Sequence, residues 1–182
     1  MDATRLLEQE HRGVEALFEQ FEQAKGDTQR KGEVVDKIIR ELSIHAAIEE
    51  EIFYPEVKAA VPDGDGLVEH SLEEHQEVKE LLSELDSMSA EEPGYHQKVE
   101  KVISDVSEHI QEEEGEMFPK LREAISANQL LEIGQKLQEG KKKAPTRPHP
   151  MSPSTPPANK IAGRAAAAVD RARDRLEGRD PA

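Results

Sequence analysis

A histidine and a glutamate four residues apart occur twice in this chain, within two segments that resemble each other. The segments are His45-Ala-Ala-Ile-Glu49-Glu-Glu-Ile-Phe-Tyr-Pro55 and His109-Ile-Gln-Glu-Glu113-Glu-Gly-Glu-Met-Phe-Pro119. On an α-helix four residues turn through about 400°, so imidazole and carboxylate lie on one face, a single turn apart. Both side chains are ligands for divalent cations. Two such pairs on neighbouring helices therefore indicate a site for two metal ions.

The segments that must position these pairs have the apolar periodicity of helices. Apolar residues recur at spacings of three and four over residues 7–21, 35–52, 68–85 and 99–117. The alternating pattern of strands is absent. Breaks containing Gly, Pro or Asp lie between them. Four long helices with short connections predict an all-α fold, an up-down-up-down four-helix bundle over residues 1–125.

Six polar residues interrupt the apolar faces of these helices: His11, His45, Glu49, His75, His109 and Glu113. In an antiparallel bundle, residues equidistant from the connecting loop lie at the same level. His11 and His45 are centred on residue 28 in the first loop, and His75 and His109 on residue 92 in the third. We therefore expect the four histidines in one layer, with the two glutamates one turn away.

A single histidine on an apolar helix face is usually a hydrogen-bonded core residue, but six coincident polar positions are different. Burial of two unpaired carboxylates costs several kcal/mol each, on the order of 3 kcal/mol or more, and no Lys or Arg lies on these faces. Divalent cations would satisfy all six groups. Four imidazoles and two carboxylates without sulfur favour iron, ahead of manganese or zinc. Glu49 and Glu113 could each bridge two ions, with two histidines per ion and places left for an oxo or hydroxo bridge and an exogenous ligand.

Taken together, these residues resemble the hemerythrin-like HHE cation-binding family, bacterial type, over residues 1 to about 125. The run Leu6-Leu-Glu-Gln-Glu-His11-Arg-Gly-Val-Glu-Ala-Leu-Phe18 is similar to the first helix of that family. The resemblance implies a non-haem di-iron centre that binds O2 or related small oxidants, with Glu49 and Glu113 as the bridges.

The third helix departs from the pattern of oxygen-carrying hemerythrins, which present a second histidine four residues from the first. Here those positions hold Ser71 and Lys79. His70 lies about 140° round the helix from His75 and is expected at the surface, unless a bulge brings it to the site. With fewer histidines, both ions keep exchangeable positions, which favours redox turnover or sensing over reversible oxygen carriage.

Tyr54 follows Glu49 by five residues, beside the helix-distorting Pro55. It could reach the site as a hydrogen-bond donor or a redox residue. The competing interpretation is a core aromatic, because Phe118 fills the same place in the other segment. The remaining carboxylates of the two segments are expected to form a solvated acidic face: Glu50, Glu51, Glu112, Glu114 and Glu116.

The chain beyond the bundle changes character. A short fifth helix is expected over 126–140, and residues 141–158, with six prolines, predict an extended linker. Residues 159–182 have high helix propensity but few large apolar side chains, so we expect an exposed marginal helix or a disordered tail. Docking of this tail on an acidic partner, or on the protein's own body, is an alternative based on charge alone.

Composition limits the partners. The net charge of −15 combines −21 over residues 1–139 with +6 over residues 140–182, so the acidic bundle is not expected to bind nucleic acid or an anionic membrane. There is no cysteine, which excludes thiol chemistry and disulfides. No run approaches the about 20 apolar residues of a membrane helix, and the N-terminus is charged. We expect a cytoplasmic protein.

The sequence thus leads to three functional hypotheses. The first is a di-iron protein that binds hydrogen peroxide, O2 or nitric oxide, with catalase-like disproportionation of peroxide as the most concrete activity that the resemblance suggests. The second is a sensor or binding module for oxygen, redox state or iron, without turnover. The third is a metal-free interaction bundle.

Overall fold

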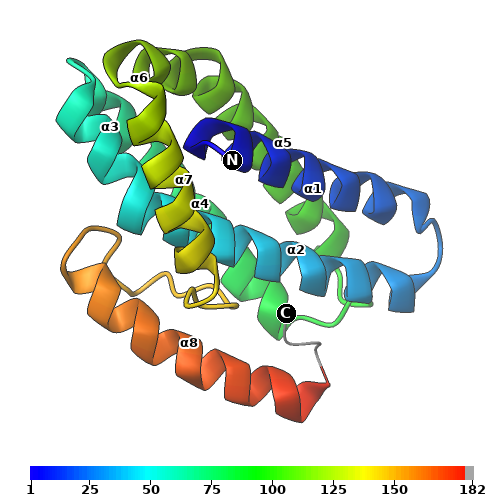
Figure 1. Cartoon of the computed structure of the whole chain (residues 1–182). Helices are drawn as coiled ribbons and strands as arrows, with labels where there is room; N and C mark the ends of the chain where they lie inside the picture. Colours follow the sequence, from blue (N-terminus) through cyan, green and yellow to red (C-terminus); the bar gives the residue numbers. More distant parts are fainter. Residues whose placement is uncertain (179–182) are drawn as a thin grey trace.

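The computed structural model describes residues 1–178, and these residues form helices and connecting turns without β-strands. Figure 1 shows the elements in chain order. They are α1 (Ala3–Gln23), α2 (Thr28–Ile48), η1 (Glu49–Phe53), α3 (Tyr54–Ala60), α4 (Gly64–Ser87), α5 (Tyr95–Glu112), η2 (Glu113–Met117), α6 (Phe118–Ala124), α7 (Ala127–Lys141) and α8 (Ala158–Glu177). The predicted all-α four-helix bundle is confirmed: α1 packs on α2 and α4 on α5.

The second and fourth rods of the bundle each contain one π-helical turn, η1 and η2, where the sequence predicted unbroken helices. The amide of Tyr54 donates to the carbonyl of Glu49, and that of Phe118 to Glu113, five residues back in each case. Proline follows both turns, at Pro55 and Pro119. Because proline has no N–H and its ring crowds the preceding turn, the wider turn accommodates it without ending the rod.

The apolar core is divided into two clusters by the layer of histidines and glutamates. One cluster lies towards the loops that follow α1 and α4 and contains Phe18, Phe21 and Leu82. The other lies towards α3, α6 and α7 and contains Phe53 and Phe118. Apolar side chains therefore close both ends of the polar layer and exclude bulk water from it.

Helix α7 covers the end of the bundle beside the first residues of α1. Ser126 and Gln129 form a capping box at its start, where the fifth helix was expected to begin. A Cβ atom at Gly134 would collide with the backbone of Met1 and Asp2, so the absence of a side chain lets α7 cross the start of α1 closely. Within residues 1–178, no helix is both long and apolar enough to cross a membrane.

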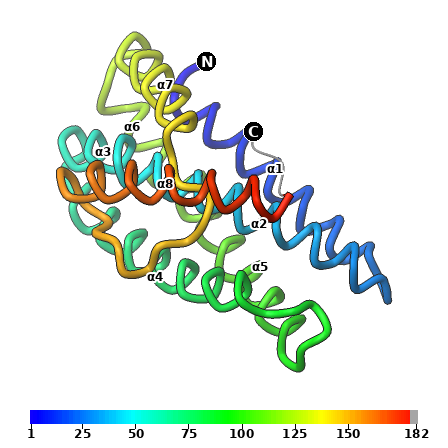
Figure 2. The backbone as a smooth tube through the Cα atoms, turned by 90° about the horizontal axis from the view of Figure 1, so that it is seen from below, coloured from blue at the N-terminus to red at the C-terminus, as the bar shows by residue number. Residues whose placement is uncertain are grey.

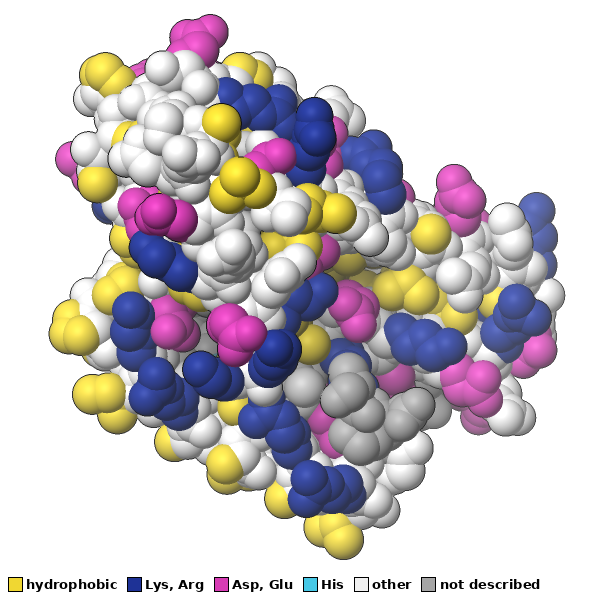
Figure 3. Space-filling model, viewed as in Figure 1, with side chains coloured by type: hydrophobic (Ala, Val, Ile, Leu, Met, Phe, Trp, Pro, Cys, Tyr) yellow, Lys and Arg dark blue, Asp and Glu magenta, His cyan; other side chains and the backbone are white. Residues whose placement is uncertain are grey.

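The basic tail forms the expected helix, α8, and folds back onto the bundle, which agrees with the alternative of docking on the protein's own body and not with a free, solvated tail. Helix α8 runs along one side of the bundle (Figures 1 and 2), and Lys and Arg side chains gather over this region in Figure 3. Arg147 in the linker is 3% exposed and contacts Asp86 of α4 together with Asp174 and Glu177 of α8. Composition pointed to a solvated tail because α8 has few large apolar side chains, but polar groups hold it in place.

Candidate metal centre

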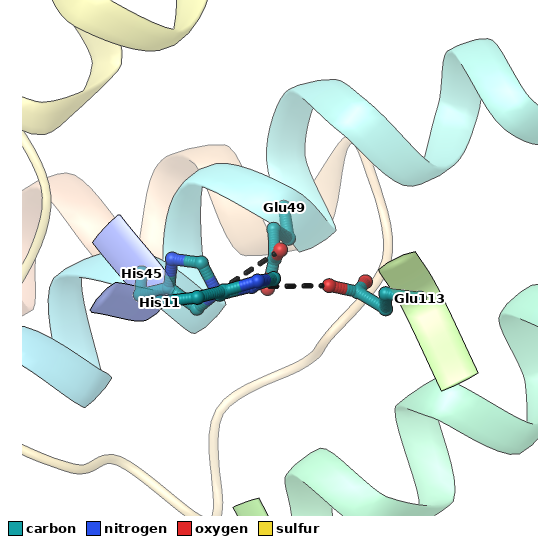
Figure 4. A group of neighbouring side chains, drawn as sticks. All are labelled: His11, His45, Glu49 and Glu113. Atoms are coloured by element: carbon teal, nitrogen blue, oxygen red, sulfur yellow. Dashed lines mark hydrogen bonds and ion pairs between the residues drawn. The ribbon is translucent and has the colours of Figure 1, made fainter. Parts of the chain in front are cut away.

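The six polar residues predicted to meet do converge between the two apolar clusters. They come from four rods: His11 from α1, His45 and Glu49 from α2 and η1, His75 from α4, and His109 and Glu113 from α5 and η2. Each is at most 6% exposed. Figure 4 shows four of them, with the carboxylates of Glu49 and Glu113 directed towards the imidazoles of His45 and His11.

The four imidazoles form two pairs, and in each pair the Nε2 atoms face each other. The Nε2 atoms of His11 and His45 are 3.2 Å apart, and those of His75 and His109 are also 3.2 Å apart. Each pair therefore joins neighbouring antiparallel helices, as the loop-centred spacing predicted.

The two glutamates span the gap between the histidine pairs. Glu49 places Oε1 3.1 Å from Nε2 of His45 and Oε2 3.5 Å from Nε2 of His75. Glu113 places Oε2 3.4 Å from Nε2 of His11 and Oε1 3.7 Å from Nε2 of His109. Each carboxylate thus presents one oxygen to each pair, which is the arrangement of a bridging ligand.

A second set of carboxylates holds the outer nitrogens of the imidazoles. The Nδ1 contacts are His11 to Glu114 at 2.8 Å, His45 to Glu10 at 3.1 Å, His75 to Glu50 at 3.0 Å and His109 to Glu74 at 2.7 Å. An ionised carboxylate only accepts, so Nδ1 is the protonated nitrogen of each ring. The expectation that Glu50 and Glu114 are solvated is therefore wrong: Glu50 is 5% exposed and both contact histidines.

This outer set has a sequence signal that spacing within one helix does not reveal. The five histidines and glutamates that the first half contributes to the site each recur 64 positions later in the second: Glu10 and Glu74, His11 and His75, His45 and His109, Glu49 and Glu113, Glu50 and Glu114. The two halves of the bundle thus contribute matching sets. Glu50 of the first half holds His75 of the second, and Glu114 of the second half holds His11 of the first.

The chemistry of these groups fits divalent cations. With Nδ1 protonated, each Nε2 presents a lone pair, and two lone pairs 3.2 Å apart repel unless a cation or a proton lies between them. Both oxygens of Glu49 and Oε2 of Glu113 are buried without a hydrogen-bond partner. Buried polar atoms without partners are costly, and metal ions would satisfy the nitrogens and the oxygens together.

The electrostatics of the cluster also demand positive charge. Burial alone would lower the pKa of His109, but Glu113 and Glu74 outweigh it and raise this pKa to about 9. Burial would likewise lower the pKa of His45, yet Glu49 and Glu10 hold it well above its ordinary value. Burial would raise the pKa of Glu113, whereas His109 and His11 hold it far below the usual range. The cluster without metal therefore attracts protons to places that cations would take.

The ring of Tyr54 is a core aromatic, as one interpretation had it, and its hydroxyl also reaches the site, as the other had it. Its hydroxyl donates to Oε1 of Glu113 at 3.0 Å and lies 3.0 Å from Nε2 of His75. Burial and the neighbouring Glu113 and Glu49 raise the pKa of this phenol well above its ordinary value. The equivalent residue of the other half, Phe118, stacks on His11 with ring centroids 5.8 Å apart. At this position the two halves of the site differ by one hydroxyl.

His70 lies at the surface, as its position on the helix predicted. Its side chain is 57% exposed, and its Nε2 is 3.1 Å from Glu112 and 3.7 Å from Glu74. It does not join the buried cluster of six residues.

Two cavities adjoin the cluster. A small one of about 30 Å³ is bounded by all four histidines and by apolar side chains that include Val78 and Val106. A larger one of about 600 Å³ lies between α8 and the bundle, and Glu50 and Lys79 form part of its wall. Lys79 also borders the small cavity, together with Ser43.

Comparison with known proteins agrees with this geometry. Residues 2–121 match the family described as the hemerythrin HHE cation binding domain. An uncharacterized hemerythrin-like protein from Schizosaccharomyces pombe is 29% identical over 170 residues, which is 92% of this chain and 83% of that protein. A DNA nickase from Nostoc is 27% identical over 147 residues, 81% of this chain but only 41% of that relative.

A solved structure has the same fold. It is the crystal structure of a hemerythrin HHE cation binding domain-containing protein from Mycobacterium kansasii, with a TM-score of 0.68 and 26% identity. The match covers 78% of this chain and 86% of that one. On the family match, the buried histidine and glutamate clusters and this structural likeness, the chain belongs to the hemerythrin HHE cation-binding domain family, whose domain binds metal cations.

Proposed function

We propose that the six converging residues hold two metal ions. His11 and His45 would hold one ion, His75 and His109 would hold the other, and Glu49 and Glu113 would each offer one oxygen to either ion. The observation that carries this assignment is the pairing of Nε2 atoms, with each glutamate presenting one oxygen to each pair.

Iron is the metal that we propose. Four imidazole nitrogens and two carboxylates, without sulfur, suit iron, while manganese and zinc fit the same donors less exclusively. The outer carboxylates support tight binding of a divalent ion, because a hydrogen-bonded carboxylate makes imidazole a more basic ligand.

We propose that the substrate is a small oxidant: hydrogen peroxide, O2 or nitric oxide. The cavity of about 30 Å³ beside the four histidines has room for only a few water-sized molecules, so it admits ligands of a few atoms. Its apolar side chains keep bulk water out. When bound, a pair of iron ions supplies Lewis acidity and storage for the two electrons that pass from one peroxide, oxidised to O2, to another, reduced to water.

Tyr54 places a proton-bearing group beside the six converging residues. Its hydroxyl lies within hydrogen-bond distance of both Glu113 and His75, and its raised pKa keeps the phenol protonated. It therefore positions the carboxylate of Glu113 and offers a hydrogen bond beside one histidine pair but not beside the other, where Phe118 stands.

Catalase-like disproportionation of peroxide is the activity we propose first. Iron analysis of the purified protein should give two ions per chain, with the near-ultraviolet absorption of a bridged ferric pair, and peroxide should release O2. The His45→Ala variant should lose iron and O2 release. The His96→Ala variant changes an exposed histidine far from the cluster and should retain both.

Each outcome separates parts of the proposal. Iron-loaded protein that releases no O2 from peroxide removes the enzymatic activity and leaves metal binding intact. Protein that takes up no iron, manganese or zinc overturns the metal assignment itself.

A sensor is the second candidate, and the docked tail favours it. The side chain of Asn159 on α8 donates to the backbone carbonyl of Glu50 at 3.3 Å, and Glu50 contacts His75. His75 is thus connected to α8 through Glu50 and Asn159, so a change of charge at the centre can affect the position of α8. If the protein is a sensor, protease cleavage between residues 150 and 157 should differ between oxidised and reduced protein; equal rates would leave the enzyme as the better proposal.

A further inference from the structure

The four outer carboxylates differ in what lies beyond them. Three of them also form an ion pair with a Lys or Arg, whose charge does not depend on pH near neutrality. The pairs are Glu10 with Lys141 at 2.6 Å, Glu50 with Lys79 at 2.5 Å, and Glu114 with Arg12. Glu74 is different. Its oxygen Oε1, the one that does not contact His109, lies beside His70. An imidazole carries a fixed charge only when it is protonated, but it is also a ligand for metals.

The atoms around His70 are arranged like a metal site. Nε2 of His70 is 3.1 Å from Oε2 of Glu112 and 3.7 Å from Oε1 of Glu74, and one atom from each residue lies within 4.8 Å of the others. Ligands bound to one ion at about 2.1 Å fall within such distances of each other. Because His70 and Glu112 are about half exposed, water can complete the coordination.

The opposite half of the bundle shows that the fold does not require this triad. The residues 64 positions earlier are Leu6, Glu10 and Ile48, and the two apolar ones are buried under α7. Only the glutamate recurs. In the second half, His70 and Glu112 stand in place of the apolar pair and are exposed to solvent beside Glu74.

We propose that His70, Glu74 and Glu112 form a surface site for a divalent cation, and that this site delivers ions to the buried centre. Glu74 joins the two places, because Oε1 faces His70 while Oε2 lies 2.7 Å from Nδ1 of His109. One imidazole, two carboxylates and water suit Fe²⁺, Mn²⁺ and Zn²⁺. The surface site stands on its own residues, whereas delivery rests on the proposed function of the centre.

Binding at the surface site is tested with Zn²⁺ and calorimetry on protein whose buried centre is already filled with iron. Wild-type protein should bind one Zn²⁺ per chain that the His70→Gln and Glu112→Gln variants bind at least about tenfold more weakly. His96→Gln is the matched control, since His96 is also half exposed and has a glutamate four residues on, Glu100 at 3.4 Å. Equal Zn²⁺ binding by wild type and His70→Gln overturns the site.

Delivery is tested by the rate at which metal-free protein takes up Fe²⁺ without oxygen. His70→Gln and Glu112→Gln should fill about tenfold more slowly than wild type and reach the same final iron content. Equal filling rates overturn delivery, and a reduced final content in the variants would make His70 part of the buried centre instead. If wild-type protein takes up no Fe²⁺, the Zn²⁺ titration is made on the metal-free protein, and Zn²⁺ binding that His70→Gln weakens then means that the proposed function fails and the surface site stands.

Discussion

At the scale of the residue, the chemistry of the centre depends on groups that never touch a bound ion as well as on those proposed to do so. Each histidine is held by a carboxylate on Nδ1, which sets its tautomer and turns Nε2 inward. Without these partners a buried imidazole could rotate or protonate at either nitrogen.

The outer carboxylates therefore predict a measurable effect on metal affinity. Glu114→Gln keeps the shape of the side chain but removes the charge beside His11, and we expect metal affinity to fall by about tenfold or more. Competition with a chelator measures it. Glu116→Gln, an exposed carboxylate paired with Lys120 in the same acidic run, is the control and should bind as wild type does. Equal affinities for the two variants would contradict the role of Glu114.

The single hydroxyl that distinguishes the two halves provides the second prediction. Tyr54→Phe makes this half of the site like the half that contains Phe118. The fold and the metal content should persist, since the ring still fills the core, but peroxide turnover should drop by about 100-fold if the hydroxyl supplies a proton or a hydrogen bond to the reacting oxygen. Oxygen release per bound iron is the measurement, and an unchanged rate would remove Tyr54 from the reaction.

At the scale of the element, the two π-helical turns decide where the residues after each glutamate point. In a regular α-helix, Tyr54 would lie about 140° away from Glu49, too far round to share its face. The i to i−5 bond from Tyr54 to Glu49 widens the turn and brings the phenol beneath the carboxylates. The prolines after the turns thus affect function without contacting the site.

Pro55→Ala tests this connection. With an N–H restored at residue 55, the α-helical turn becomes available, and Tyr54 should swing away from His75 and Glu113. The variant should then behave like Tyr54→Phe, with metal retained and turnover reduced. Pro119→Ala is its counterpart in the other half, where Phe118 has no hydroxyl to lose, and should have the smaller effect on turnover per iron. The opposite order of the two effects would contradict the argument.

At the scale of the whole molecule, the tail forms one wall of the large cavity beside Glu50 and Lys79. Its attachment rests on Arg147, which is buried among Asp86, Asp174 and Glu177. Removing one partner from such a network leaves carboxylates buried without compensation, at a cost of about 3 kcal/mol.

Arg147→Met should release α8 from the bundle and leave the bundle folded. Limited proteolysis should then cleave the tail quickly while residues 1–140 survive, and small anions such as azide should reach the centre faster, because the wall beside Lys79 is gone. Rates of azide binding followed by absorption provide the measurement. A variant whose tail resists protease as wild type does would show that other contacts suffice to hold α8.

Acid should loosen the same attachment. Hydrogen bonds from Arg173 and from Arg147 lower the pKa of Glu177 from 4.5 to about 2 in the docked tail. Arg173 lies on α8 itself and stays beside Glu177 in a free tail, so only the bond from Arg147 depends on the docked arrangement. To the extent of that bond the docked state binds fewer protons than a free tail, and this contribution is complete above pH 4.5 and is lost as the pH falls towards about 2. Protease sensitivity of the tail should rise over this range in wild type. Glu177→Gln should lack that part of the pH dependence; identical profiles would exclude this carboxylate.

Much of the centre could be predicted from the sequence, because helical periodicity determines which residues share a face and loop positions determine which share a level. These two rules brought together the four histidines, Glu49 and Glu113. They also placed His70 at the surface, apart from the site. The bundle itself followed from four apolar stripes and short breaks.

Other features were decided only by the tertiary structure. The partnership of each Nδ1 with a carboxylate on another rod depends on how far each helix is rotated, as with Glu114 beside His11. The reach of Tyr54 depends on a π turn that periodicity treats as α, and the docking of the tail depends on Arg147 contacting three carboxylates on two helices, α4 and α8. Spacing along one helix fixes direction and height, whereas contacts between helices depend on rotations and local turns that emerge only when the whole chain packs.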